Sequence, residues 1–150
     1  MAQAIKLAAA LHQLDNDGKV TLENGTSAAW YSTYVNYAVA EEIIEAKYAT
    51  YTQAQMNAII TRREFVHIFY GAMDNYKVIN TVTANAIPDV KIGTTANAEE
   101  IYTFYRAGIL TGSDAKGTFY PNNNIKRSEV ATILVRMYDT AQRETGLTLS

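Results

Sequence analysis

A motif that occurs twice, 65 residues apart, constrains the fold of this chain more than any other feature. Thr61-Arg62-Arg63-Glu64 and Lys126-Arg127-Ser128-Glu129 each open a segment whose apolar residues recur at the spacing of one buried helix face. These residues are Phe65, Ile68, Phe69, Ala72 and Met73 in the first segment, and Val130, Ile133, Leu134, Met137 and Tyr138 in the second. Ala4, Leu7, Ala8 and Leu11 form a weaker third example. Such repetition predicts an array of related helical units.

A second type of helix precedes each motif and repeats at a spacing of 66 residues. Its apolar residues are Val35, Ala38, Val39, Ile43 and Ile44, matched by Ile101, Phe104, Tyr105, Ile109 and Leu110. The connecting segments are rich in turn-forming residues, and no set of strands that could form a sheet is evident. We therefore predict an all-α fold of helix–loop–helix repeats. Residues 1–19 would end a truncated repeat, residues 20–74 and 75–140 would form two further repeats, and residues 141–150 would be a tail.

Composition excludes several classes of protein. The chain is 48% hydrophobic and 19% charged, a composition that favours an ordinary globular core over disorder. Its formal net charge is only −2, so no general attraction to nucleic acid is expected. It contains no cysteine, and no apolar run is long enough to span a membrane. The N-terminus lacks the basic leader of a signal peptide, so the protein either stays in the cell or is a piece of a longer chain. A start inside a repeat favours a missing upstream portion.

The two polar motifs combine a helix cap with arginines that the cap does not need. Thr61 and Glu64 have the spacing of a capping box, which is a sufficient structural role for both. Arginine in the first turn of a helix is disfavoured by the helix dipole, so capping does not explain Arg62 or Arg63. Either side chain is a solvated charge or, beside free N-terminal amides, part of an anion site. In the second motif Lys126 replaces the capping threonine, yet the arginine and the glutamate remain.

Four elements, taken together, resemble the S-layer homology family. They are Ile87-Pro88-Asp89-Val90, the helix end Tyr105-Arg106-Ala107-Gly108-Ile109-Leu110-Thr111-Gly112, the loop Gly117-Thr118-Phe119-Tyr120-Pro121, and Ile125-Lys126-Arg127-Ser128-Glu129-Val130. The preceding unit resembles the same family more weakly, through Trp30, Val35, Ile43-Ile44 and Thr61-Arg62-Arg63-Glu64. The resemblance extends over roughly residues 1 to 140, and the combination of spaced elements is more specific than any one of them.

The resemblance implies three repeats packed as a pseudo-threefold helical bundle that binds secondary cell-wall polysaccharide. It implies an anionic, often pyruvylated ligand and an exported protein held on the surface of a Gram-positive-type bacterium, without catalysis, cofactor, nucleic acid or membrane insertion. Further repeats of the same chain or a second chain are possible partners. The residues it assigns to the ligand are Arg62, Arg127, Trp30 and Asp89, followed by Arg63, Glu64 and Glu129.

The two repeats also depart from the family pattern. Ala96 stands where a second tryptophan is expected, and the first repeat lacks the Gly-x-Phe-x-Pro loop. A competing interpretation is therefore that the repeats are degenerate and serve only packing or self-association. Likewise, Trp30 is either a half-buried packing residue or a sugar-stacking one.

Other patterns predict no chemistry. Asp15-Asn16-Asp17-Gly18 resembles part of a calcium loop, but Gln13 and Asn24 stand where such a loop needs carboxylates, so a turn is favoured. His12 and His67 lack partners at metal-ligand spacing on their own helices, and no metal site is expected. No nucleophile or phosphate-binding motif suggests an enzyme.

Overall fold

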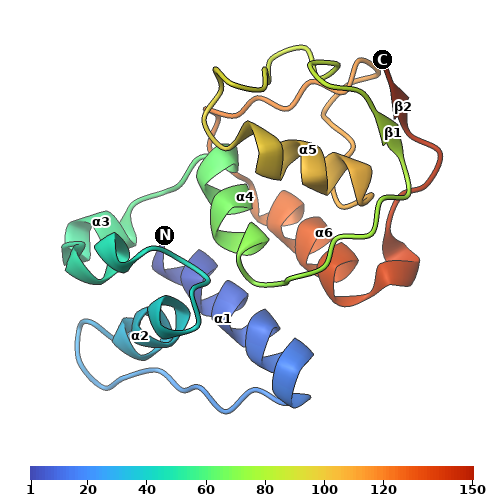
Figure 1. Cartoon of the computed structure of the whole chain (residues 1–150). Coiled ribbons are helices and arrows are strands. Elements are labelled where there is room, and N and C mark those ends of the chain that lie inside the picture. Colours follow the sequence, from blue (N-terminus) through green and yellow to red (C-terminus); the bar gives the residue numbers. More distant parts are fainter. The chain divides into compact units, whose positions relative to one another are not determined.

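A computed structural model describes residues 1–150 and is predominantly helical (Figure 1). The α-helices are α1 (Ala2–Asp17), α2 (Ser32–Ala40), α3 (Gln53–Asn57), α4 (Arg62–Tyr70), α5 (Ala98–Arg106) and α6 (Arg127–Tyr138). Two 3-10 helices, η1 (Ala46–Thr50) and η2 (Thr140–Gln142), and two strands, β1 (Thr81–Val82) and β2 (Thr148–Leu149), complete the fold. The predicted all-α class is confirmed. The pseudo-threefold packing and the division into repeats stay predictions.

The chain forms two compact units. The first unit comprises Met1–Ile60 and Ile68–Asp74, and the second comprises Thr61–His67 and Asn75–Ser150. In the first unit the alanine-rich face of α1 is buried and α1 contacts α2. The core of the second unit is built from large side chains: Ile87, Ile101, Tyr102, Phe104, Tyr105, Ile109, Phe119, Ile133 and Met137. Each unit therefore has the apolar interior that the helical spacing predicts.

One feature of the second unit is absent from the predicted elements. β1 and β2 pair in parallel, with Thr81 opposite Thr148 and Val82 opposite Leu149, and they lie side by side near the C-terminus in Figure 1. The segment predicted to be a tail is consequently packed: Arg143 is buried, and Asn80 donates a 2.9 Å hydrogen bond to the carbonyl oxygen of Glu144. Two-residue strands were missed because they are too short for a repeating apolar–polar pattern.

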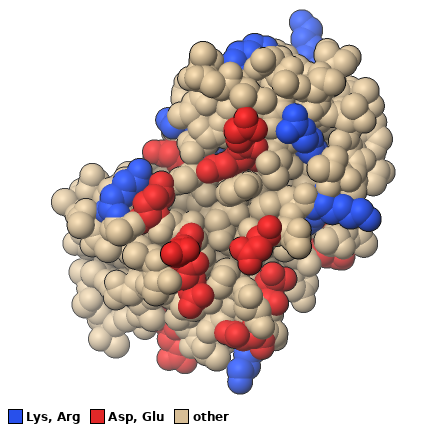
Figure 2. Space-filling model, in the orientation of Figure 1, with Lys and Arg blue, Asp and Glu red and all other residues tan.

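Both signs of charge occur on the face drawn in Figure 2, where Asp and Glu side chains lie mainly in the centre and lower part and Lys and Arg side chains mainly toward the top and edges. The net charge of the chain is −2. None of the helices has the combination of length and apolar character needed to span a bilayer. Recognition of an anion by this surface therefore depends on local arrangements of cations.

Candidate functional site

The N-terminus of α4 carries the predicted capping box. The amide of Thr61 donates to Glu64 Oε2 over 2.8 Å, and the amide of Glu64 donates to Thr61 Oγ1 over 3.2 Å. At α6 only half of this arrangement remains. Glu129 Oε2 accepts from the amide of Lys126 over 2.8 Å, but an ammonium group has no lone pair with which to accept in return. Glu64 and Glu129 thus both have a structural task at the start of a helix.

Arg62 is buried within the second unit, although it stands in the first turn of a helix. Its side chain is enclosed: the residue is 7% exposed, and the guanidinium carbon lies 4.8 Å from the centroid of the Phe119 ring. Nε donates to the carbonyl oxygen of Phe119 over 2.7 Å, and Nη1 forms an ion pair with Glu129. Burial lowers the pKa of Arg62, an effect that Tyr105 and Asp89 oppose. Arg62 therefore ties α4 to the loop that ends in Pro121 and to α6.

The free amides that motivated an anion site at the start of α4 are already occupied. The amide of Arg62 donates to the carbonyl oxygen of Asn123 over 2.8 Å, and that of Arg63 donates to Pro121 over 3.1 Å. The expectation that backbone and guanidinium together receive an anion at this helix end is therefore wrong. The loop that follows Phe119 fills the position because its carbonyl groups meet the unpaired donors of the first turn.

Asp89 holds the loop before Pro121 in place. Its Oδ1 accepts from the amide of Phe119 over 2.9 Å, and its Oδ2 accepts from the amide of Tyr120 over 2.7 Å. Tyr120 has a φ of 59°, a left-handed conformation that is costly for a bulky residue. The two hydrogen bonds to one carboxylate stabilise this turn. The turn also places the carbonyl oxygen of Phe119 where it accepts from Nε of Arg62.

We expect Asp89→Asn to lower the free energy of unfolding by about 2 kcal/mol, since one loop amide would face an NH₂ group instead of a carboxylate oxygen. For a chain of this size that corresponds to a decrease of roughly 4–8 °C in melting temperature. Thermal unfolding followed by circular dichroism measures the change, with Asp74→Asn as the control because Asp74 is exposed. Equal melting temperatures for the two variants would show that Asp89 does not stabilise the loop before Pro121.

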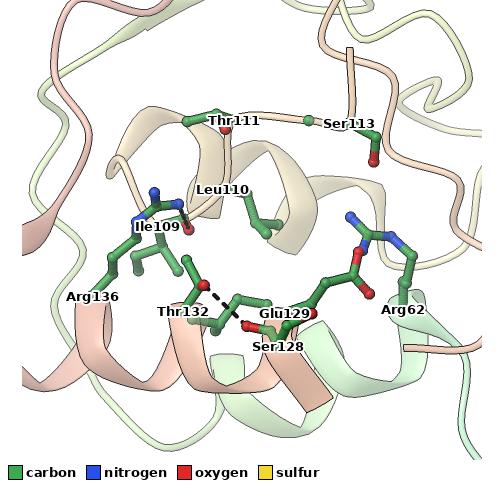
Figure 3. Close-up of a pocket in the computed structure, with 11 residues that line it drawn as sticks. Arg62, Ile109, Leu110, Thr111, Ser113, Ser128, Glu129, Thr132 and Arg136 are labelled. Carbon is green, nitrogen blue, oxygen red and sulfur yellow. Dashed lines mark hydrogen bonds and ion pairs between the residues drawn. The ribbon is translucent and has the colours of Figure 1, made fainter. Parts of the chain in front are cut away.

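A pocket of about 320 Å³ lies beside Arg62 in the second unit. Figure 3 shows its two walls: the loop that follows α5 on one side, and the start and middle of α6 on the other. The lining residues are Arg62, Ile109, Leu110, Thr111, Gly112, Ser113, Ser128, Glu129, Thr132, Ile133 and Arg136. The pocket therefore combines aliphatic surface with hydroxyl groups and two cations.

The two cations of the pocket are held differently. Arg136 donates from Nη1 to the carbonyl oxygen of Ile109 over 3.2 Å and from Nη2 to Glu144 over 2.9 Å. The Glu144 side chain is 53% exposed, so this pair is weak and open to exchange with another carboxylate. Nη2 of Arg62 makes no hydrogen bond to the protein and, in Figure 3, points toward the space below the Thr111–Ser113 loop. Each arginine thus retains donor capacity for an anionic ligand.

The structure gathers only part of the predicted site. Arg62 and Glu129 line the pocket, whereas Arg127 is exposed on α6 and Arg63 is half-buried, and neither lines it. Asp89 acts through the loop rather than at the pocket wall. Trp30 belongs to the first unit, where the Lys6 ammonium lies 5.7 Å from its ring centroid.

Sequence reasoning missed most of the pocket wall on α6. Ser128, Thr132 and Arg136 follow one another at intervals of four residues, so they share one face of the helix. That spacing was readable in the sequence. The missing information was that the face borders the Thr111–Ser113 loop, which is a tertiary relation.

The sequence model of the S-layer homology domain matches residues 86–131. No curated protein and no solved structure matches the chain. The matched segment contains Asp89, α5, the pocket loop and the start of α6 up to Ala131. S-layer homology domains are non-catalytic modules that anchor proteins to cell-wall polysaccharide and so associate with the cell surface. Together with the motifs at Asp89, Gly108, Phe119 and Glu129, the match shows that residues 86–131 of this chain are an S-layer homology domain.

Proposed function

We propose that this chain is an anchoring module that holds an exported protein on the surface of a Gram-positive-type bacterium by binding anionic, pyruvylated secondary cell-wall polysaccharide. The observation that carries the proposal is the pocket with Arg62 and Arg136 at its walls, most of which lies within the S-layer homology domain. A carbohydrate presents many hydroxyl groups together with an aliphatic ring face, and the pocket offers partners for both.

The charge of the pocket supports an acidic sugar. Hydrogen bonds between guanidinium groups and carboxylates are stronger than those between neutral groups, and they are directional. A pyruvyl carboxylate that enters the pocket would reach Nη2 of Arg62 and would compete with the exposed Glu144 for Arg136. The hydroxyl groups of Thr111, Ser113 and Thr132 would then accept from or donate to the sugar ring.

The remaining residues of the site have supporting tasks in this proposal. Glu129 orients Arg62, and Asp89 holds the loop whose carbonyl group receives Arg62 Nε. Glu64 caps α4, and Arg63 adds positive charge next to Pro121. We further propose that Arg127 would take the role of Arg62 toward a following repeat.

Trp30 is a separate contact surface in this proposal. It is half-buried, and it meets Tyr31 and Tyr34 edge to face with ring centroids 5.7 and 6.2 Å away. Lys6 adds a cation above the same group of rings. An aromatic ring with an adjacent ammonium group suits a charged sugar, so Trp30 would provide an additional contact between the chain and a long polysaccharide.

Filling the pocket tests the assignment. We expect Ser113→Trp to abolish retention of the intact chain on purified, protein-free cell wall, because the indole would occupy the pocket. Ala115→Trp is the matched control, since Ala115 is exposed on the same loop but does not line the pocket. Circular dichroism verifies that both variants are folded. Retention of Ser113→Trp equal to that of the control would exclude this pocket as the binding site.

Charge recognition is tested on the ligand side as well as the protein side. We expect Arg136→Gln to weaken binding of a pyruvylated glycan at least tenfold, which corresponds to about 1.4 kcal/mol, and to leave binding of the depyruvylated glycan unchanged. Isothermal titration calorimetry with each glycan gives both dissociation constants. A similar loss for both ligands would show that the arginine does not recognise the pyruvyl group.

A further inference from the structure

The outer face of α6 is apolar and uncovered. Val135 is 51% exposed and Tyr138 is 66% exposed, and they are joined by exposed Ala131 and half-buried Leu134. Residues 131, 134, 135 and 138 recur at intervals of three and four, which places them on one side of the helix. Such spacing is that of a helix that packs against another helix.

The same face is partly covered in the equivalent helix of the preceding motif. Counting from the two repeated motifs, Ala131 and Leu134 correspond to Val66 and Phe69 of α4, both of which are fully buried. Val135 corresponds to Tyr70, which is 37% exposed, and Tyr138 corresponds to Met73, which follows the end of α4 and is half-buried. This face of the repeated helix is therefore built for packing, and α6 leaves it open.

We propose that the outer face of α6 is a self-association surface, on which α6 of a second molecule packs antiparallel about a twofold axis. The ends of the helix favour this partner. Lys126 and Arg127 lie at its N-terminal end and Asp139 follows its C-terminal end, and all three residues are exposed. Antiparallel packing brings opposite charges together, whereas parallel packing would bring like charges together.

The register follows from the same residues. With Ala131 opposite Leu134 of the second molecule, Arg127 meets Tyr138 across the interface, with Asp139 next to it. Arginine over a tyrosine ring and beside a carboxylate is a favourable arrangement for both partners. Small Ala131 near the axis allows the two helix backbones to approach closely.

Self-association brings a second molecule next to the polysaccharide pocket. Ser128 and Thr132 line the pocket from α6 and stand seven and three residues before Val135, so they border the proposed surface, whereas Arg136 lies farther around the helix. The proposal is argued from the exposed apolar face of α6 and does not rest on the proposed function. It adds that two anchoring modules can act on one polymer, which raises the avidity of a dimer above the affinity of each chain.

Sedimentation equilibrium over a range of concentrations tests the surface. We expect the chain to show a concentration-dependent mass that rises to twice that of the monomer. Val135→Glu should weaken the dimer at least tenfold, while Val78→Glu, at a residue that is 65% exposed elsewhere in the second unit, should not. A monomer at all concentrations, or a dimer unaffected by Val135→Glu, overturns the proposal. Loss of avidity should lower wall retention of Val135→Glu, whereas its affinity for a short pyruvylated glycan with a single binding site, measured by calorimetry, reports on the proposed function alone.

Crosslinking tests the antiparallel register, because the native chain has no cysteine. In the proposed register the two copies of residue 131 are displaced along the axis by about 5 Å, and those of residue 138 by about 16 Å. A short bismaleimide should therefore link Ala131→Cys into a dimer and should link neither Tyr138→Cys nor the control Val78→Cys. Crosslinking of Tyr138→Cys at the level of Ala131→Cys would show a parallel or unrelated contact and overturn the antiparallel arrangement.

Discussion

Arg62→Ala is expected to lower the free energy of unfolding by about 3 kcal/mol, in the range found when one partner of a buried ion pair is removed. Three interactions disappear together. Glu129 loses its cation, the carbonyl oxygen of Phe119 loses its donor, and the Phe119 ring loses the guanidinium that covers it. The lower end of the range applies because the side chain of Glu129 is itself partly exposed, so water compensates for some of the loss.

The repeated motif supplies a matched control for this experiment. Arg127 occupies the position that corresponds to Arg62 but is exposed, so Arg127→Ala is expected to change stability by no more than about 0.5 kcal/mol. Urea unfolding of the two variants and the wild type, monitored by circular dichroism, gives the three free energies. Equal effects of the two substitutions would contradict a special role for Arg62.

The pair Arg62 and Arg127 also shows what the sequence could and could not predict. Motif spacing correctly indicated helices with one buried face, the capping box at Thr61 and Glu64, and the S-layer homology domain. It could not distinguish a buried arginine from an exposed one, because that depends on whether a loop and another helix pack against the start of the helix. Here the segment from Phe119 to Asn123 does so for Arg62.

The candidate site illustrates the same limit. The family resemblance predicts Asp89 to be a ligand residue, yet its two carboxylate oxygens accept hydrogen bonds from the amides of Phe119 and Tyr120. Arg136 belongs to no motif, so the sequence does not predict it, although it lines the pocket. A linear pattern reports which residues share a helix face, but the depth of a side chain and its partners arise from contacts between distant segments. The parallel pairing of β1 with β2 is another such contact.

Two backbone segments approach each other closely at Gly108, so substitution of this glycine is the second change for which we expect a large loss of stability. Gly108 follows the end of α5 with a φ of 74°, as the predicted helix stop requires, and the amide of Ile109 donates to Phe104 to close the last turn. A β-carbon at this position would lie 2.3 Å from the carbonyl oxygen of Glu144. Gly108 is therefore needed both for its backbone conformation and for the space that the C-terminal segment occupies.

Gly108→Ala should consequently lower the free energy of unfolding by more than backbone strain in the left-handed conformation alone would do. Gly93 provides the comparison, because its φ is 87° but a β-carbon there would meet nothing within 4 Å. We expect Gly93→Ala to lower the free energy of unfolding by about 1 kcal/mol, from backbone strain. Gly108→Ala adds a clash with backbone that cannot rotate away, for a total of about 3 kcal/mol. Urea unfolding measures both values.

The clash at Gly108 is also expected to disturb the pocket. Relief of the contact requires Glu144 to move, and Glu144 both receives the hydrogen bond from Arg136 and donates its own amide to the carbonyl oxygen of Gly108. Because Ile109 and Leu110 come directly after Gly108, the pocket wall would shift with it. Gly108→Ala should therefore lose wall retention at temperatures where it is still folded, whereas Gly93→Ala should retain it. Loss of stability in Gly108→Ala with retention unchanged would show that the C-terminal segment does not support the pocket.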